Sequence, residues 1–140
     1  MLIKEIMKKK PDLVICAPTA YVTEAAKKMD DFNVGCILIT EDGSLKGILT
    51  DRDIAISVVA KGKNPRETQV KEIMKTHLIT GRPDWDIFEA TKLMADKKIR
   101  RLPIQTNGRV EGFVSLADLA PVFQRELDSF LEIESAPVGH

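Results

Sequence analysis

The sequence predicts an α/β (α+β) fold in which two β-α-β-β-α repeats pack about a pseudo-twofold axis. Three observations support this prediction: one residue pattern occurs twice, apolar residues in each copy follow helical and then strand spacing, and a hairpin signal joins the strands. The chain has 140 residues, 44% apolar and 30% charged, which is typical of a folded domain. Because each copy of about 65 residues would bury too little surface alone, we expect one shared core and two related clefts.

The repeat is visible in matched positions along the chain. The segment IKEIM at 3–7 recurs as VKEIM at 70–74, 67 positions later. From the first long helix onward the spacing is 65 positions. The matched pairs are Glu24 and Glu89, Ala25 and Ala90, Lys27 and Lys92, Met29 and Met94, Gly43 and Gly108, Gly47 and Gly112, and Asp53 and Asp118. One register held over so many positions indicates an internal repeat rather than chance.

The repeat also sets the expected domain boundaries. Repeat 1 covers residues 1–62, and repeat 2 covers residues 68–133. The polar segment 63–67 connects the two repeats. Residues 134–140 form a C-terminal tail that we expect to be disordered or a short extension.

Each repeat is expected to begin with a short strand followed by a helix. Residues 13–16 form a short run rich in β-branched side chains, which favours a strand, and residues 78–80 are the counterpart in repeat 2. Small and apolar side chains then follow at i, i+3, i+4 and i+7, which is one face of a helix. These residues are Val22, Ala25, Ala26 and Met29 in repeat 1, and Ile87, Ala90, Thr91 and Met94 in repeat 2.

A hairpin and a second helix complete each repeat. Two strands, 36–40 and 45–49, are expected on either side of the turn sequence EDGS, and the turn sequence TNGR repeats this signal in repeat 2. Asp-Gly and Asn-Gly pairs are typical of tight turns between antiparallel strands. The second helix is expected to begin near Asp51, and its counterpart is expected to run from near Leu116 to about Ile133.

The charge balance and the hydropathy pattern exclude several classes of protein. The 21 basic and 21 acidic side chains leave no net charge, which argues against non-specific nucleic-acid binding. Apolar runs such as 34–39 are too short to cross a bilayer, and the N-terminus lacks a signal-peptide pattern. We therefore expect a cytoplasmic protein that does not insert into membranes.

The sequence offers no metal site and no catalytic constellation. Cys16 and Cys36 each lie in a short apolar run, where a small buried side chain is expected. His77 and His140 do not complete a plausible zinc site with these cysteines. Neither a nucleophile–base arrangement nor a phosphate-binding loop of the GxxxxGK[ST] kind is present. We therefore expect that the protein is not an enzyme and binds no metal.

The most informative local motif closes each repeat. The segments GILTDRD at 47–53 and GFVSLAD at 112–118 place a hydroxyl residue at the start of a helix and an aspartate three residues later. One interpretation is a capping box, in which both side chains bond free amides of the first helical turn. The other is a ligand site, because a helix N-terminus and a hydroxyl suit a phosphate, while a carboxylate accepts hydrogen bonds from ribose hydroxyls. The two interpretations are compatible.

Four motifs occur together over residues 3–131: the Ile-Met lead-in, the Glu-Ala-x-x-x-Met helix, the RLPI strand at 101–104 and the closing Gly-x-x-Ser/Thr-x-x-Asp. This combination strongly resembles a tandem pair of CBS (cystathionine β-synthase) domains, also called a Bateman module. The resemblance implies a regulatory module that binds adenosine-containing ligands such as AMP, ADP, ATP or S-adenosylmethionine between the repeats and transmits a conformational change to a partner. It also implies that an adenine nucleotide is a regulatory ligand rather than a cofactor, and that the modules form a homodimer.

The resemblance further assigns residues to two clefts of different phosphate capacity. The better phosphate site is expected to combine Ser115, Asp118, Arg100 and Arg101 with Leu13, Val14 and Ile15. The other cleft is expected to combine Thr50 and Asp53 with Leu78, Ile79 and Thr80, with Arg52 nearby, and to favour a ligand with less phosphate or none at all. The aspartates are assigned to ribose, the hydroxyl residues and arginines to phosphate, and the apolar strand residues to adenine.

Two other functions stay open on sequence grounds. A sensor of the S-adenosylmethionine type would use the same clefts. A dimerisation or interaction module would bind no nucleotide, and its hydroxyl–aspartate pairs would act only as helix caps. Nucleic acid is an unlikely partner because the net charge is zero, and the effector protein is expected to be a separate, unidentified chain.

Overall fold

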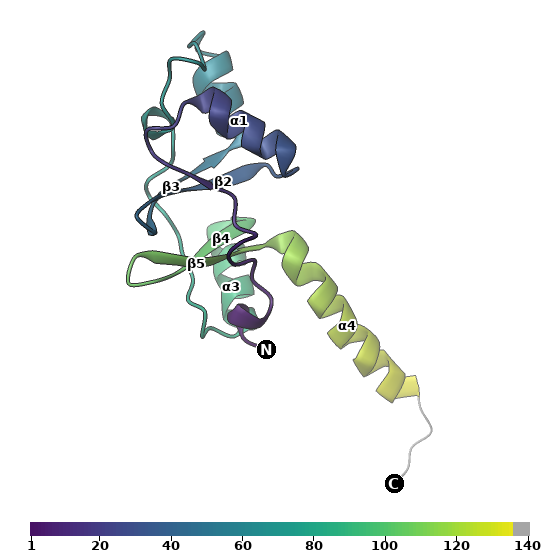
Figure 1. Ribbon diagram of the computed structural model, residues 1–140. Coiled ribbons are helices and arrows are strands. Elements are labelled where there is room, and N and C mark those ends of the chain that lie inside the picture. Colours follow the sequence, from purple (N-terminus) through teal and green to yellow (C-terminus); the bar gives the residue numbers. More distant parts are fainter. Residues whose placement is uncertain (136–140) are drawn as a thin grey trace.

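A computed structural model describes residues 1–135 and has the predicted mixed α/β architecture (Figure 1). Five strands form one sheet in the order β1-β2-β3-β5-β4. The elements are η1 (Ile3–Glu5), β1 (Ile15–Cys16), α1 (Val22–Asp31), β2 (Cys36–Glu41), β3 (Ser44–Thr50), α2 (Asp51–Ile54), η2 (Ala55–Val59), η3 (Val70–Glu72), α3 (Ile87–Lys97), β4 (Arg101–Thr106), β5 (Arg109–Ser115) and α4 (Leu116–Ser135). Repeat 1 is built around the β2–β3 hairpin and repeat 2 around the β4–β5 hairpin (Figure 1).

The two hairpins meet at their turns, on repeat-equivalent residues. Ser44 of β3 pairs with Arg109 of β5, and these residues are 65 positions apart, as the repeat requires. Both predicted hairpin turns form. The φ angles are positive at both central residues of each turn, 53° and 81° at residues 42–43 and 53° and 83° at residues 107–108, as Asp-Gly and Asn-Gly pairs favour. The pseudo-twofold axis therefore passes between the turns.

The predicted first strand of repeat 2, at residues 78–80, does not form. In repeat 1 the Leu38 N–H donates a hydrogen bond to the Val14 carbonyl at 3.1 Å, which joins β1 to β2. The equivalent residue in repeat 2 is Pro103, which has no N–H to donate. A single bridge from Gly81 to β4 is all that remains of the pairing. A proline thus reduces the β-α-β-β-α pattern of repeat 2 by one strand.

The apolar core is divided into two clusters rather than shared, so the expectation of one core is wrong. The strand pairing between the hairpins is limited to one residue pair and is flanked by hydrogen bonds between the two turns, and each hairpin is covered by its own helices. The repeat 1 cluster consists of Cys16, Ala25, Met29, Ile37, Ile39, Leu49 and Val70. The repeat 2 cluster consists of Ile3, Ile87, Ala90, Met94, Leu102, Ile104, Val114, Leu119 and Val122. Ile3 and Val70 are fully buried, and each lies in the cluster of the other repeat.

These two residues belong to lead-in segments that the repeats exchange. The backbone groups of Lys8 and Phe113 exchange two hydrogen bonds of 2.9 Å, so the first segment of repeat 1 pairs with β5 of repeat 2. In the same way, Lys75 and Ile48 exchange hydrogen bonds of 2.9 and 3.0 Å, so the first segment of repeat 2 pairs with β3 of repeat 1. The exchange ties the two clusters together.

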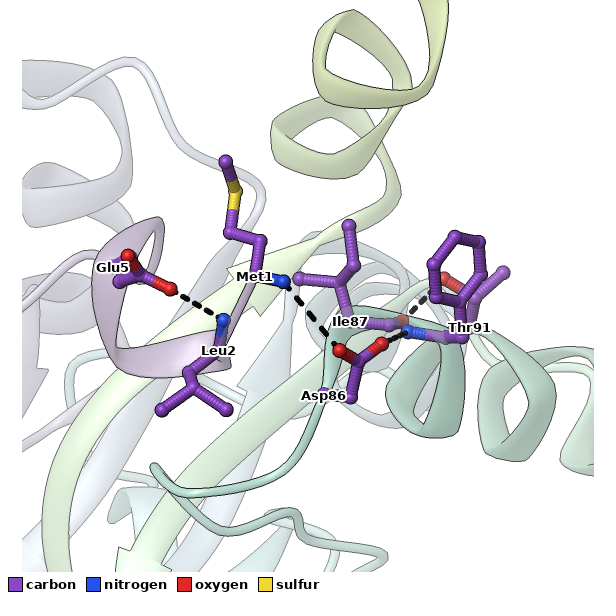
Figure 2. Close-up of polar contacts among 7 residues, drawn as sticks. Met1, Leu2, Glu5, Asp86, Ile87 and Thr91 are labelled. Carbon is purple, nitrogen blue, oxygen red and sulfur yellow. Dashed lines mark hydrogen bonds and ion pairs between the residues drawn. The ribbon is translucent and has the colours of Figure 1, made fainter. Parts of the chain in front are cut away.

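The first residues also lie against the start of α3 (Figure 2). The Ile87 N–H donates to the Met1 carbonyl at 3.0 Å, and the Ile3 N–H donates to the Trp85 carbonyl at 2.8 Å. Asp86 caps the helix, because its Oδ1 accepts from the Phe88 N–H at 2.9 Å. The lead-in segment of repeat 1 therefore contacts both the core and the helix start of repeat 2.

The second helices of the repeats differ in length. α2 has four residues and continues as the π-helical η2, whereas α4 has 20 residues and projects from the body of the molecule (Figure 1). Its end at Ser135 extends into the predicted tail, and the rest of that tail, 136–140, lies outside the described residues. No helix within residues 1–135 is both long enough and apolar enough to span a bilayer.

The lead-in segments pack directly against Gly47 and Gly112 and leave no room there for a side chain. We therefore predict that Gly47→Ala and Gly112→Ala each destabilise the fold. A Cβ at Gly47 would lie 2.6 Å from Met74 Sδ and 2.9 Å from the Lys75 carbonyl oxygen, and one at Gly112 would lie 2.8 Å from the Lys8 carbonyl oxygen. We expect each variant to lose about 1–3 kcal/mol in urea unfolding. The exposed neighbour variant Lys46→Ala should stay close to wild type, and equal stability of all three would contradict the exchange.

Candidate functional site

Two clefts lie between the repeats, as the sequence predicts. The first, here called the Ser115 cleft, has a volume of about 330 Å³. It is lined by Lys8, Asp12, Leu13, Val14, Asn33, Val34, Gly35, Cys36, Leu38, Arg101, Phe113, Ser115 and Ala117. The cleft therefore combines the first strand region of repeat 1 with the hydroxyl residue that closes repeat 2.

The second, here called the Thr50 cleft, has a volume of about 340 Å³. It is lined by Ile48, Thr50, Lys75, His77, Leu78, Ile79, Lys98, Ile99, Arg100, Arg101 and Pro103. Most positions in this cleft are repeat equivalents of positions in the first, as in Val14 with Ile79 and Ser115 with Thr50. Both volumes fall in the range of roughly 300–1,000 Å³ that is usual for small-molecule sites.

The closing motif of each repeat forms a complete capping box. Thr50 Oγ1 accepts from the Asp53 N–H at 3.1 Å, and Asp53 Oδ2 accepts from the Thr50 N–H at 3.0 Å. In repeat 2 the corresponding distances for Ser115 and Asp118 are 3.2 and 2.8 Å, and the Ser115 hydroxyl also donates to Asp118 at 3.0 Å. The capping interpretation is therefore confirmed. The hydroxyl residues line the clefts, whereas the aspartates lie behind them.

The pairing of the arginines with the Ser115 cleft alone needs correction. Arg101 lines both clefts, and Arg100 lines the Thr50 cleft as well as an open groove beside Ser115. The reason is the pseudo-twofold arrangement, which brings the residues before β4 to the same cleft as segment 78–80 of their own repeat. Gly35 occupies the equivalent position in the Ser115 cleft.

Three other assigned residues do not line their expected clefts. Ile15 lies in β1 and pairs with Leu38, and Arg52 is exposed outside the Thr50 cleft. Thr80 lies in a separate groove beside Trp85, where its hydroxyl accepts a hydrogen bond of 2.9 Å from a glutamine side chain. Leu13, Val14, Leu78 and Ile79 do line the clefts to which they were assigned.

Sequence reasoning missed two lysines and a histidine of the Thr50 cleft. Lys75 lies 3.3 Å from Asp53 Oδ1, and His77 and Lys98 line the same cleft. The sequence did not indicate Lys75 because this residue follows the 67-residue spacing of the lead-in segments, and each lead-in segment packs against the other repeat. Lys98 was detectable in principle, since it is the repeat equivalent of Asn33 and ends the corresponding helix.

The cysteines are buried and have no partner for metal binding. Burial raises the pKa of the Cys36 thiol to about 12, an effect that the Arg101 guanidinium partly offsets, and burial raises the pKa of the Cys16 thiol to about 11. Within residues 1–135, no three His, Cys, Asp or Glu side chains gather as a metal site would require.

Comparison with known proteins shows to which family this two-repeat chain belongs. A family model for the CBS domain matches residues 3–60 and 70–124. The chain belongs to the CBS domain family. It is a CBS pair, and the fold expected from the resemblance is confirmed by solved CBS structures.

Similar CBS proteins include a curated relative and two solved structures. The CBS domain-containing protein YhcV of Bacillus subtilis is 45% identical over 104 residues, which is 74% of each chain. The CBS domain pair of MJ0100, solved with 5′-methylthioadenosine and S-adenosyl-L-methionine, is 27% identical, with a TM-score of 0.79 over 90% of this chain and 98% of that one. The hexameric CBS-CP12 protein from cyanobacteria is 26% identical, with a TM-score of 0.73 over 85% of this chain and 66% of that one.

We predict that both thiols of the native protein resist modification at pH 8. Their raised pKa values keep them protonated, and the protonated thiol is a poor nucleophile. Ellman's reagent should therefore label neither Cys16 nor Cys36 on the timescale of seconds, while the urea-unfolded chain at the same pH should release two equivalents of chromophore. Rapid labelling of Cys36 in the native protein would show that the Ser115 cleft, which this residue lines, opens more than the structure implies.

Proposed function

We propose that this CBS pair is a regulatory module that binds an adenosine-containing ligand of the AMP, ADP or ATP class in its inter-repeat clefts. The observation that supports this most directly is the position of Thr50 and Ser115. Each hydroxyl residue lies at a helix start and faces a cleft whose opposite wall belongs to the other repeat. The hydroxyl and the positive end of the helix dipole suit a phosphate, although the amides of the first turn of α2 already donate to the Gly35 carbonyl and to the Asp51 and Thr50 side chains.

The cleft walls also suit the rest of such a ligand. Leu13 and Val14 in one cleft, and Leu78 and Ile79 in the other, present apolar side chains and backbone to an adenine ring. Asp53 and Asp118 lie one helical turn behind the hydroxyl residues, where a carboxylate accepts from ribose hydroxyls. In the Thr50 cleft this requires Lys75 to release Asp53, and the 63% exposed Lys75 side chain is free to turn toward a phosphate.

A ligand that spans a cleft would transmit its binding to both repeats. Ser115 and Ala117 connect the Ser115 cleft to the first turn of α4, the helix that projects from the body (Figure 1). A small rotation of this turn would be amplified at the far end of a 20-residue helix. An effector protein that binds one orientation of α4 better than another would detect this rotation. The ligand causes the rotation only if it binds the two orientations of α4 with different affinity.

S-adenosylmethionine is a second candidate ligand, favoured for the Ser115 cleft. MJ0100 binds this ligand and 5′-methylthioadenosine. The Ser115 cleft contains Asp12, whose carboxylate complements a cationic ligand and repels a phosphate chain. The remaining alternative, a module that binds no nucleotide, is consistent with capping boxes that are complete without a ligand.

We predict that at least one of AMP, ADP, ATP, S-adenosylmethionine and 5′-methylthioadenosine stabilises the protein in a thermal-shift experiment. A ligand at 100 times its dissociation constant should add about 2.7 kcal/mol. Asp53→Asn and Asp118→Asn should each weaken binding in the affected cleft roughly tenfold in calorimetry, because asparagine can still cap but loses the charge that binds ribose hydroxyls.

The exposed variant Asp128→Asn, on the far part of α4, is the matched control and should bind like wild type. Absence of stabilisation by all five compounds would contradict nucleotide sensing and support a dimerisation or interaction module.

We also propose that the protein forms a homodimer through the apolar stripe of α4. Phe123, Leu127, Phe130 and Leu131 follow at i, i+4, i+7 and i+8, and the last three are 51%, 63% and 52% exposed. The stripe continues onto α3, since the rings of Phe123 and Phe88 pack edge to face with centroids 5.3 Å apart. The exposed part of α4, residues 124–135, would be only marginally stable as a helix in water if nothing packed against it.

A second copy of the chain is the occupant that best fits this stripe. It would present the same apolar residues, so the contact can be isologous and closed. The zero net charge of the whole chain also means that two copies experience no long-range net repulsion. The hexamer of the CBS-CP12 protein is an example of self-assembly by a similar chain.

We predict that Leu127→Ser combined with Phe130→Ser converts the protein to a monomer in light scattering coupled to size-exclusion chromatography. Wild type should elute with twice the monomer mass of 15.6 kDa. Glu132→Ser, an exposed change on the opposite face of the same helix, should leave the dimer intact. A monomeric wild type, or a double variant that stays dimeric, would contradict the assignment of this interface.

A further inference from the structure

The two clefts present different charges at repeat-equivalent positions. Where the Ser115 cleft has Asn33, Gly35 and Asp12, the Thr50 cleft has Lys98, Arg100 and His77. The Thr50 cleft thus has two lysines and two arginines and, among the described residues that line it, no carboxylate. The Ser115 cleft has one lysine and one arginine against one aspartate. Every difference at these positions makes the Thr50 cleft the more basic of the two.

Lys98 is a particularly informative member of this set. It ends α3 in the left-handed conformation, with a φ of 55°, a position where glycine and asparagine are favoured. Its repeat equivalent Asn33 has a φ of 51° and follows that preference. A lysine is a costly choice for this backbone conformation, and this lysine lines the Thr50 cleft.

The cations of the Thr50 cleft are also largely uncompensated. Asp53 pairs with Lys75, but no ion pair within residues 1–135 involves Lys98, Arg100 or Arg101. Gathering like charges without partners in one cleft is unfavourable, and a multivalent anion relieves the repulsion. Arginine and lysine together supply both the bidentate and the point-charge contacts that phosphate groups accept.

We infer that the two clefts sort ligands by class: the Thr50 cleft takes the phosphate chain of a nucleoside di- or triphosphate, with Lys98 and Arg100 as its specificity-determining residues. The Ser115 cleft takes an adenosyl ligand without a phosphate chain. This inference rests on the proposed function, and it reverses the phosphate preference expected from the sequence. The module would then respond to two ligands at once.

Calorimetry with ATP, AMP and 5′-methylthioadenosine tests the sorting. Lys98→Asn installs the residue that repeat 1 has at this position and suits the left-handed backbone, so the fold should be kept. Combined with Arg100→Gln, it should weaken ATP binding at least tenfold, weaken AMP binding less than threefold and leave 5′-methylthioadenosine unchanged. Lys97→Asn removes the same charge one residue away, outside both clefts, and should bind ATP like wild type.

Amide shifts in NMR identify the occupied cleft. ATP should shift the amides of Leu78 and Ile79, and 5′-methylthioadenosine those of Leu13 and Val14. If ATP binds but the double variant keeps wild-type affinity, or if ATP shifts only Leu13 and Val14, the sorting is wrong and the proposed function stands. If none of the three compounds binds wild type, and ADP and S-adenosylmethionine do not bind it either, the proposed function itself fails.

Discussion

The exchange of lead-in segments between the repeats is the contact on which the rest of the structure depends. Ile3 is buried in the core of repeat 2 and Val70 in the core of repeat 1, although Ile3 belongs to repeat 1 in sequence and Val70 to repeat 2. The two hairpins themselves contact each other only around their turns. Burial of two large aliphatic side chains, each contributing roughly 1.5–3 kcal/mol, therefore joins two units that would be marginal alone. The same exchange brings Lys8 and Lys75 to the walls of the two clefts.

The capping boxes show that one motif stabilises the helix starts and also places the hydroxyl residues at the cleft walls. The Thr50–Asp53 and Ser115–Asp118 pairs satisfy the free amides of their helix starts without a ligand. The hydroxyl residues are thereby held in one place at the cleft surface. A site that is ordered before its ligand arrives loses less conformational entropy on binding. The capping and ligand-binding interpretations of this motif are thus two consequences of one geometry.

Because of the pseudo-symmetry, the two clefts are lined by equivalent backbone positions but carry different side chains. Equivalent backbone positions line both, but Asn33 and Gly35 on one side correspond to Lys98 and Arg100 on the other. Arg101 lines both clefts. Under the proposed function, a ligand phosphate bound to Arg101 in one cleft would change the charge that a ligand meets in the other cleft. Any coupling between the two sites would therefore be strongest at this side chain.

The sequence alone determined the repeat, the order of most elements, the hairpin turns, the CBS resemblance and the pairing of each hydroxyl residue with the first strand region of the other repeat. These features are local or periodic, because turn chemistry and helical spacing act over a few residues. Only the tertiary structure shows that Ile3 is buried in the core of repeat 2 and that Arg100 lines the Thr50 cleft. It also shows that α4 projects from the body of the molecule (Figure 1). It also showed that Pro103 removes a strand from repeat 2. These features depend on contacts between segments far apart in the chain, and a spacing pattern does not say which copy of a repeat a segment will pack against.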